Sequence, residues 1–240
     1  MDKYKLFTFI IFFIFLQNVS SHANEFELST SVGPFKRIIY TFIYDLKKTE
    51  SEYRIDFQLT SKKDIVKIFS NKTNGNGYSK GIVIDDSFVV KNYEYIEEKS
   101  DSTKKYLIDF NNRLNIDGKR IPAYDKTKLT PINKKMLEGS VDPALAFYQL
   151  VSSFSIKSCS NKIKIYDAKR RFNLSLSIIK KEKNYIECLI KTKKIGGYKI
   201  KQKINPFEIP YEMIIIYQLI DGKYKMTSIS GKNNFLNIEL

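Results

Sequence analysis

The sequence predicts a mainly β protein: a curved antiparallel sheet, or half-open barrel, packed on one α-helix. Apolar and polar residues alternate in many short segments, and tight-turn pairs such as Asp221-Gly222 separate those segments. Only one segment of the mature chain has clear helical spacing. Strands that follow each other through tight turns pair in antiparallel fashion. A curved sheet that closes around apolar residues often leaves a ligand groove at its mouth.

The N-terminus has the pattern of a secretory signal peptide over residues 1–23. Lys3 and Lys5 precede an apolar run over residues 6–16, and Ser21-His22-Ala23 places small residues before an expected cut at Asn24. The run is shorter than the roughly 20 residues that span a bilayer. We therefore expect a cleaved leader, a single β-rich envelope domain over 24–240, and no transmembrane span after cleavage. The alternative is an uncleaved N-terminal anchor.

The first half of the mature chain is expected to be strands and turns. Residues 53–60 alternate apolar and polar over the whole segment, which is typical of a half-buried strand. Two Asn-Gly pairs predict a turn over 71–77, and Asp117-Gly118 predicts a hairpin turn. Residues 65–69 fit a short helix or a strand, and 122–140 are expected to be a long surface connection. Other strands are predicted at 26–32, 36–46, 81–90, 91–97 and 106–110, with a polar turn at Asp85-Asp86.

The helix is predicted from Asp142 to about Phe154. Asp142 is a favourable N-cap, and Pro143 stands at the first helical position. Beyond it, residues 171–178 and 186–190 alternate, whereas 211–220 is apolar at almost every position. That pattern predicts a central strand buried on both faces. The last strands are expected at 223–230 and 234–240.

The chain has two cysteines, Cys159 and Cys188. In an oxidising compartment an even pair predicts a disulfide. The bond would close a ring of about 30 residues, which stabilises the fold by roughly 3–4 kcal/mol in the chain-entropy model. The alternative is two unpaired buried thiols.

Several C-terminal segments resemble the proteobacterial family called domain of unknown function 3108. They are 141–146 before the helix, Cys159, the hairpin 166–174, Cys188, the Ile195-Gly196-Gly197-Tyr198-Lys199 segment and the hairpin 221–223. The resemblance covers 141–240 best. The family pattern has Asp-Gly where this chain has Asp167-Ala168. The resemblance implies a periplasmic or envelope β protein of uncharacterised role and supplies no catalytic residues.

The sequence lacks the usual catalytic groups. Its only histidine is His22, within the predicted leader, so the mature chain has no imidazole for triad chemistry or metal ligation. A bonded cysteine pair leaves no thiolate. Two carboxylates could still hydrolyse a glycan, and the candidates are Glu94, Glu97, Glu98, Asp101 and Asp109. A solvated charged surface is the simpler interpretation. We expect no enzyme, no cofactor and no metal site.

The formal net charge is +15, yet lysine is spread over the chain rather than gathered in one block. That spread, with export, argues against a nucleic-acid partner. The densest basic cluster of the C-terminal half is Lys169-Arg170-Arg171, a candidate anion-binding site because adjacent arginines can hold phosphate or carboxylate. The alternative interpretation of this cluster is the charged end of a hairpin, which would discourage pairing with the edge of another sheet.

These features favour a non-catalytic periplasmic protein that binds a lipid or another apolar or amphipathic envelope component. The 17 Phe and 16 Tyr supply aromatic surface to line a groove. A scaffold or assembly factor that docks on another envelope protein is the second hypothesis, and a carboxylate-dependent glycan hydrolase is the third.

Overall fold

The strands form one antiparallel sheet of 13 members in the order β7-β6-β5-β4-β3-β2-β1-β13-β12-β11-β10-β9-β8. The computed structural model describes residues 20–32, 35–61, 73–112, 115–152, 159–200, 212–231 and 237–239. The front half contains β1 (Ser20–Val32), β2 (Phe35–Lys48), β3 (Glu52–Ser61), β4 (Thr73–Ile84), β5 (Ser87–Lys99), β6 (Ser102–Asn112) and β7 (Asn115–Ile121). The back half contains β8 (Lys162–Tyr166), β9 (Arg171–Lys181), β10 (Tyr185–Gly196), β11 (Glu212–Ile220), β12 (Lys223–Gly231) and β13 (Asn237–Glu239).

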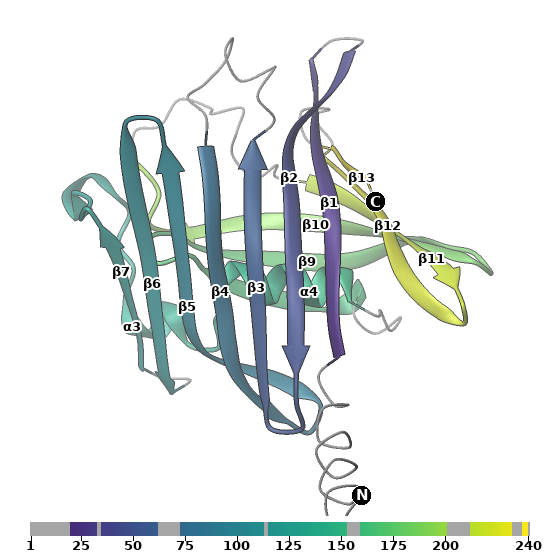
Figure 1. Cartoon of the computed structure of the whole chain (residues 1–240), viewed down its shortest axis with the longest axis horizontal. Helices are drawn as coiled ribbons and strands as arrows, with labels where there is room; N and C mark the ends of the chain where they lie inside the picture. Colours follow the sequence, from purple (N-terminus) through teal and green to yellow (C-terminus); the bar gives the residue numbers. More distant parts are fainter. Residues whose placement is uncertain are drawn as a thin grey trace, which may run out of the picture.

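The sheet curls so that its two halves face each other. Figure 1 shows β7 to β1 as an upright front layer and β9 to β10 crossing behind it, with α4 (Pro143–Val151) between them. The edge strands β7 and β8 also meet, because a Cβ added at Gly118 would lie 2.2 Å from the Tyr166 hydroxyl. The predicted fold class, a curved sheet or half-open barrel on one helix, is confirmed.

Helix α4 fills the space inside the curl. Asp142 caps it by accepting hydrogen bonds from the Ala144 and Leu145 amides, at 2.8 and 3.0 Å. The helix buries Ala144, Leu145, Ala146 and Leu150. The Tyr217 hydroxyl of β11 donates to the Leu150 carbonyl at 2.8 Å. The helix thus joins both halves of the sheet, and the predicted cap is confirmed. It ends at Val151 rather than near Phe154, and 153–158 lie outside the described residues.

Aromatic rings line the inner face of the front half. Tyr106, Tyr95 and Phe57 follow one another with centroids 5.8 Å apart, and Phe57 then meets Phe42 at 6.1 Å. Phe42 packs edge-on against Phe147 of α4 at 4.9 Å. This row of rings connects β6 to the helix, so the aromatic residues mainly fill the core.

Two predicted turns are wrong. Both Asn-Gly pairs, at 74–77, lie inside β4 and are paired with β3 and β5 there, whereas 71 and 72 lie outside the described residues. Asp117-Gly118 lies inside β7. In both places glycine is used because an aromatic ring occupies the space of a Cβ: Tyr95 lies over Gly75, and Tyr166 over Gly118. Ring packing therefore overrides the local turn preference.

Other boundaries also differ from the prediction. β5 is continuous from Ser87 to Lys99, so residue 91 begins no new strand, and a bulge lies there instead. β11 buries one face fully and the other only in part, and its end is exposed. The connection 122–140 holds only the short helices η1 (Lys126–Lys128) and α3 (Lys134–Leu137). The hairpins at 85–86 and 221–222 form as predicted.

Some predictions fall on residues that are not described. Residues 1–19, most of the expected leader, lie outside the described ranges, as does 65–69. β1 begins at Ser20, so the expected cut before Asn24 would remove four residues from its start. Among the described residues, no helix has the length and apolar character needed to cross a membrane.

Candidate functional site

Three cations stand side by side across the front half of the sheet. The register places Lys47 of β2 opposite Arg54 of β3, and Arg54 opposite Lys80 of β4. Like charges directly opposite each other destabilise a sheet. Asp56 offsets part of this repulsion, since it lies 2.8 Å from Arg54 Nε and 3.4 Å from Lys47 Nζ. Asp45 is a second carboxylate near the row, 3.5 Å from Lys47 Nζ, so Lys80 is the member of the row without an ion pair in the described structure.

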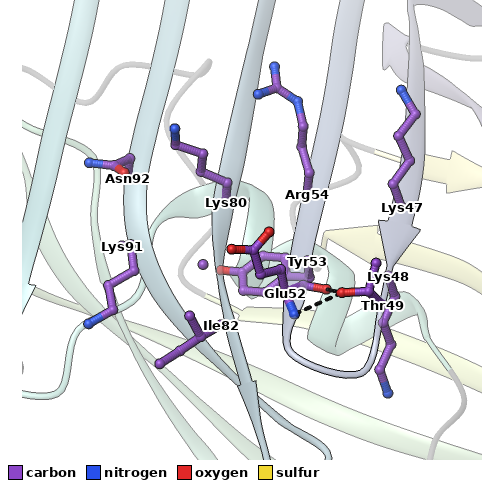
Figure 2. A pocket seen from close by; sticks show the side chains of 11 residues that line it. Lys47, Lys48, Thr49, Glu52, Tyr53, Arg54, Lys80, Ile82, Lys91 and Asn92 are labelled. Carbon is purple, nitrogen blue, oxygen red and sulfur yellow. Dashed lines mark hydrogen bonds between the residues drawn. The ribbon is translucent and has the colours of Figure 1, made fainter.

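The row borders a recess of about 560 Å³, which we call the basic recess (Figure 2). Its lining is Lys47, Lys48, Thr49, Glu52, Tyr53, Arg54, Lys80, Gly81, Ile82, Lys91 and Asn92. Glu52 is the only carboxylate among them. In the described part of the chain, no carboxylate lies within ion-pair distance of Lys80 or Lys91. Both ammonium groups are thus available to an anion.

A second recess of about 490 Å³, the apolar recess, adjoins the first. It is lined by Ile82, Ile84, Phe88, Val89, Val90, Lys91, Phe110, Ile116, Gly139, Ser140 and Val141. Ile82 and Lys91 line both recesses. The apolar recess lies beside the first residues of β5, whose pairing with β6 begins only at Asn92. The bulge at Lys91 coincides with this parting of the strands.

Ser140 adds one polar atom to the apolar recess. Its hydroxyl is buried and has no hydrogen-bond partner in the described structure. A buried hydroxyl without a partner costs free energy, so such a group is commonly satisfied by water or by a bound molecule. The apolar recess therefore combines mostly apolar walls with the Ser140 hydroxyl and the Lys91 ammonium group.

A buried polar network begins at Tyr53, which lines the basic recess. Ser79 Oγ donates to Asp142 Oδ2 at 2.7 Å, and the Tyr53 hydroxyl lies 3.3 Å from Ser79 Oγ. Asp142 is fully buried, and this desolvation raises its pKa to about 6 although the Leu145 amide, Ser79 and the Ala144 amide all favour the charged form. Burial likewise raises the pKa of Tyr53, with Asp142 adding to the effect. Because Asp142 is sealed from solvent, its role is to anchor α4.

The predicted anion-binding residues point in different directions. Arg171 is only 2% exposed and donates to the Met136 carbonyl and to Asn173 Oδ1, each at 2.8 Å. Arg170 is paired with Asp167 at 2.7 Å. Lys169 lies 6.0 Å from the centre of the Tyr124 ring, and burial, followed by the charge of Arg170, lowers its pKa. The structure does not gather the three side chains around one anion.

The predicted disulfide is present. Cys159 and Cys188 are bonded, with Cα atoms 5.9 Å apart, and both residues are fully buried. The bond ties the segment after α4 to β10.

Two of the five candidate acidic residues, Glu94 and Glu97, form ion pairs with lysine, and Asp101 accepts a hydrogen bond from the Ser102 hydroxyl at 3.1 Å. Glu94 lies 2.8 Å from Lys105, and Glu97 lies 3.1 Å from Lys104. Their spacing of three places them on opposite faces of β5. Among the described residues, no group of three or more His, Cys, Asp or Glu side chains could hold a metal ion.

Sequence reasoning missed both recesses. Lys47, Arg54 and Lys80 are 7 and 26 positions apart, and their alignment depends on a register that no local pattern specifies. The sequence contains part of the signal, because Lys47 and Arg54 lie on the polar sides of alternating strands, whereas Lys80 stands between Tyr78 and Ile82 on its side of β4.

Comparisons with known proteins leave the family open. No family model matches the chain, so the resemblance to domain of unknown function 3108 stays a prediction, and no curated protein matches either. Among solved structures, the chain is similar to a beta-barrel-like protein of domain of unknown function DUF1849 from Brucella abortus. The two share 10% identity over 92% of this chain and 96% of that one, with a TM-score of 0.49.

Proposed function

We propose that this chain is a non-catalytic protein that binds an anionic amphiphile, such as a lipid, in the joined recesses. The observation that carries the proposal is the sharing of Ile82 and Lys91 between a basic and an apolar recess. An acidic headgroup would lie among Lys80, Lys91 and Arg54, and an apolar chain along Ile84, Val89 and Phe110.

Charge and shape both support this ligand class. Ligand sites are concave and mostly apolar, with a few placed polar groups. The two unpaired lysines supply the charge, and the Ser140 hydroxyl supplies one further hydrogen-bonding group. A neutral apolar ligand would leave the cations unused, whereas a small inorganic anion would leave the apolar walls unused.

The compartment is part of the same proposal. We place the protein in the periplasm of its source, on the leader-like pattern of residues 1–23 and on the disulfide, which forms and persists in oxidising surroundings. Mass spectrometry of the protein purified from cells checks this point, since cleavage leaves Asn24 as the first residue. Intact residues 1–23 on a cytosolic, reduced chain would contradict it.

Binding can be measured by calorimetry with lysophosphatidylglycerol below its micelle concentration. Lys80→Glu and Lys91→Glu should each weaken binding on the order of tenfold, because a hydrogen bond to a charged group contributes roughly 1.5–3 kcal/mol. Ile84→Asp should also weaken binding. The matched controls are Lys126→Glu and Ile43→Asp, exposed residues of the same types outside the recesses. Equal affinity in all variants, or no binding by the native chain, would overturn the proposal.

A further inference from the structure

Two hairpins project from the back half of the sheet and lie against each other. Tyr185 of β10 is opposite Gln218 of β11, and the Leu219 amide donates to the Asn184 carbonyl at 2.7 Å. Figure 1 shows the ends of β9–β10 and β11–β12 extending together to the right, beyond the front layer. We call residues 178–185 and 218–225 the hairpin tip.

The hairpin tip exposes large apolar side chains on both of its faces. Ile178 and Ile179 are 38% and 48% exposed, and Leu219 and Ile220 are 41% and 38% exposed. Neighbouring residues of a strand point to opposite sides. Leu219 and Ile220 therefore point to opposite faces of the hairpin tip, whereas a register shift at Ile179 interrupts the alternation of β9. The described residues leave all four side chains partly exposed.

Lysines surround these apolar side chains. Lys180, Lys181, Lys183, Lys223 and Lys225 are all exposed. Glu182 pairs with Lys180 at 2.9 Å and Asp221 with Lys225 at 3.2 Å. In the described structure no carboxylate lies within ion-pair distance of Lys181, Lys183 or Lys223. The hairpin tip thus combines an apolar end with uncompensated positive charge.

We propose that the hairpin tip inserts into the surface of an anionic lipid bilayer. A bilayer surrounds an inserted ribbon on both faces, whereas a protein partner would typically cover one. Apolar residues at the distal end would enter the interface, and the lysines would meet acidic headgroups there. The residues differ from those of the recesses, so this inference does not depend on the proposed function.

The chain has no Trp, so a single introduced Trp reports on one place. Leu219→Trp should shift its emission to shorter wavelength on mixing with vesicles of phosphatidylglycerol and phosphatidylethanolamine, because the indole leaves water. Brominated acyl chains should quench it. Ile43→Trp is the control, since Ile43 is similarly exposed, at 37%, on the front half. An unchanged Leu219→Trp spectrum, or equal shifts at both positions, would overturn the inference.

Charge reversal gives the second readout. The triple variant Lys181→Glu, Lys183→Glu, Lys223→Glu should lose vesicle binding by on the order of a hundredfold or more at low ionic strength. Its control reverses Lys126, Lys134 and Lys135, exposed lysines on the connection 122–140. Binding to pure phosphatidylcholine vesicles should be weak for every form. Undiminished vesicle binding by the first triple variant would refute insertion, as would a tip that binds only a protein.

Discussion

The two halves of the sheet enclose α4 with different side chains. The front half uses a few large rings, and several of these lie over a glycine of the neighbouring strand, as Tyr95 of β5 lies over Gly75 of β4. The back half uses many aliphatic side chains, among them Ile163, Leu174, Ile186 and Ile215, and it contains the disulfide. Rings fill space in large units, and aliphatic chains fill it in small ones.

The outer surfaces of the two halves also differ. The basic and apolar recesses lie beside the front half, whereas the back half carries the projecting hairpin tip. The basic and apolar recesses and the hairpin tip thus use separate residues, although a further recess of about 460 Å³ is lined by both halves, through residues such as Phe88 and Tyr217. The helix, capped by Asp142 and bonded to Tyr217, connects them. We expect a surface substitution in one half to leave the surface features of the other intact, because the recesses and the hairpin tip share no residue.

Removing the disulfide should have the largest effect. The variant Cys159→Ala, Cys188→Ala should lose roughly 3–4 kcal/mol of unfolding free energy, because the unfolded chain regains the entropy of an open loop. Urea denaturation measures the loss. Hydrogen exchange should accelerate in β8–β11 more than in β2–β6, since both cysteines anchor the back half. Equal acceleration in both halves would show that the disulfide stabilises the front half as much as the back half.

Asp142 should make stability depend on pH, with a slightly smaller effect. Burial raises the pKa of its carboxyl in the fold to about 6, above the ordinary value of 3.8. As pH rises, the unfolded chain loses this proton at a lower pH than the folded chain does. The stability that the group contributes is therefore lost between about pH 4 and pH 7. The loss corresponds to roughly 3 kcal/mol.

Asp142→Asn removes that titration while keeping an amide oxygen that can cap α4. The difference in unfolding free energy between native and variant chains should therefore shift in favour of the variant on going from pH 4 to pH 7. Asp142→Ala is the control, because it loses the cap at every pH. A native-minus-variant difference that does not change with pH would contradict the raised pKa of Asp142.

The sequence predicted features that depend on neighbouring residues. Alternation identified the strands, Asp142-Pro143 identified the start of the helix, and Asp221-Gly222 identified a hairpin. Ala168 shows the limit of such rules: its φ of +68° is the left-handed conformation that glycine normally supplies, so the turn forms with an unfavourable residue.

Features that depend on distant residues were not predictable. The Asn-Gly pairs of β4 have strong turn chemistry, yet their role is set by Tyr95 and Phe57, which arrive from other strands. The cation row likewise needs three strands in one register. Arg171 was expected at a solvated hairpin and is buried, because backbone carbonyls and Asn173 replace water around its guanidinium.

Two glycines, one in each half of the sheet, test the difference between the halves with the smallest expected effect. Gly81 lies beneath the Tyr53 ring in the front half, and an added Cβ would be 2.1 Å from the Val89 carbonyl oxygen and 2.8 Å from Tyr53 Cε1. Gly222 is in open space, at a φ of +73°. Gly81→Ala should cost about 1–3 kcal/mol through overpacking, and Gly222→Ala about 1 kcal/mol through backbone strain.

The decisive readout is ligand affinity rather than stability. Gly81 and Tyr53 both line the basic recess, so displacing the ring should also weaken lysophosphatidylglycerol binding. Gly222→Ala changes the hairpin tip and should leave that affinity unchanged. If the two variants lowered affinity equally, the recess would be responding to general destabilisation, and the division of surface features between the halves would be wrong.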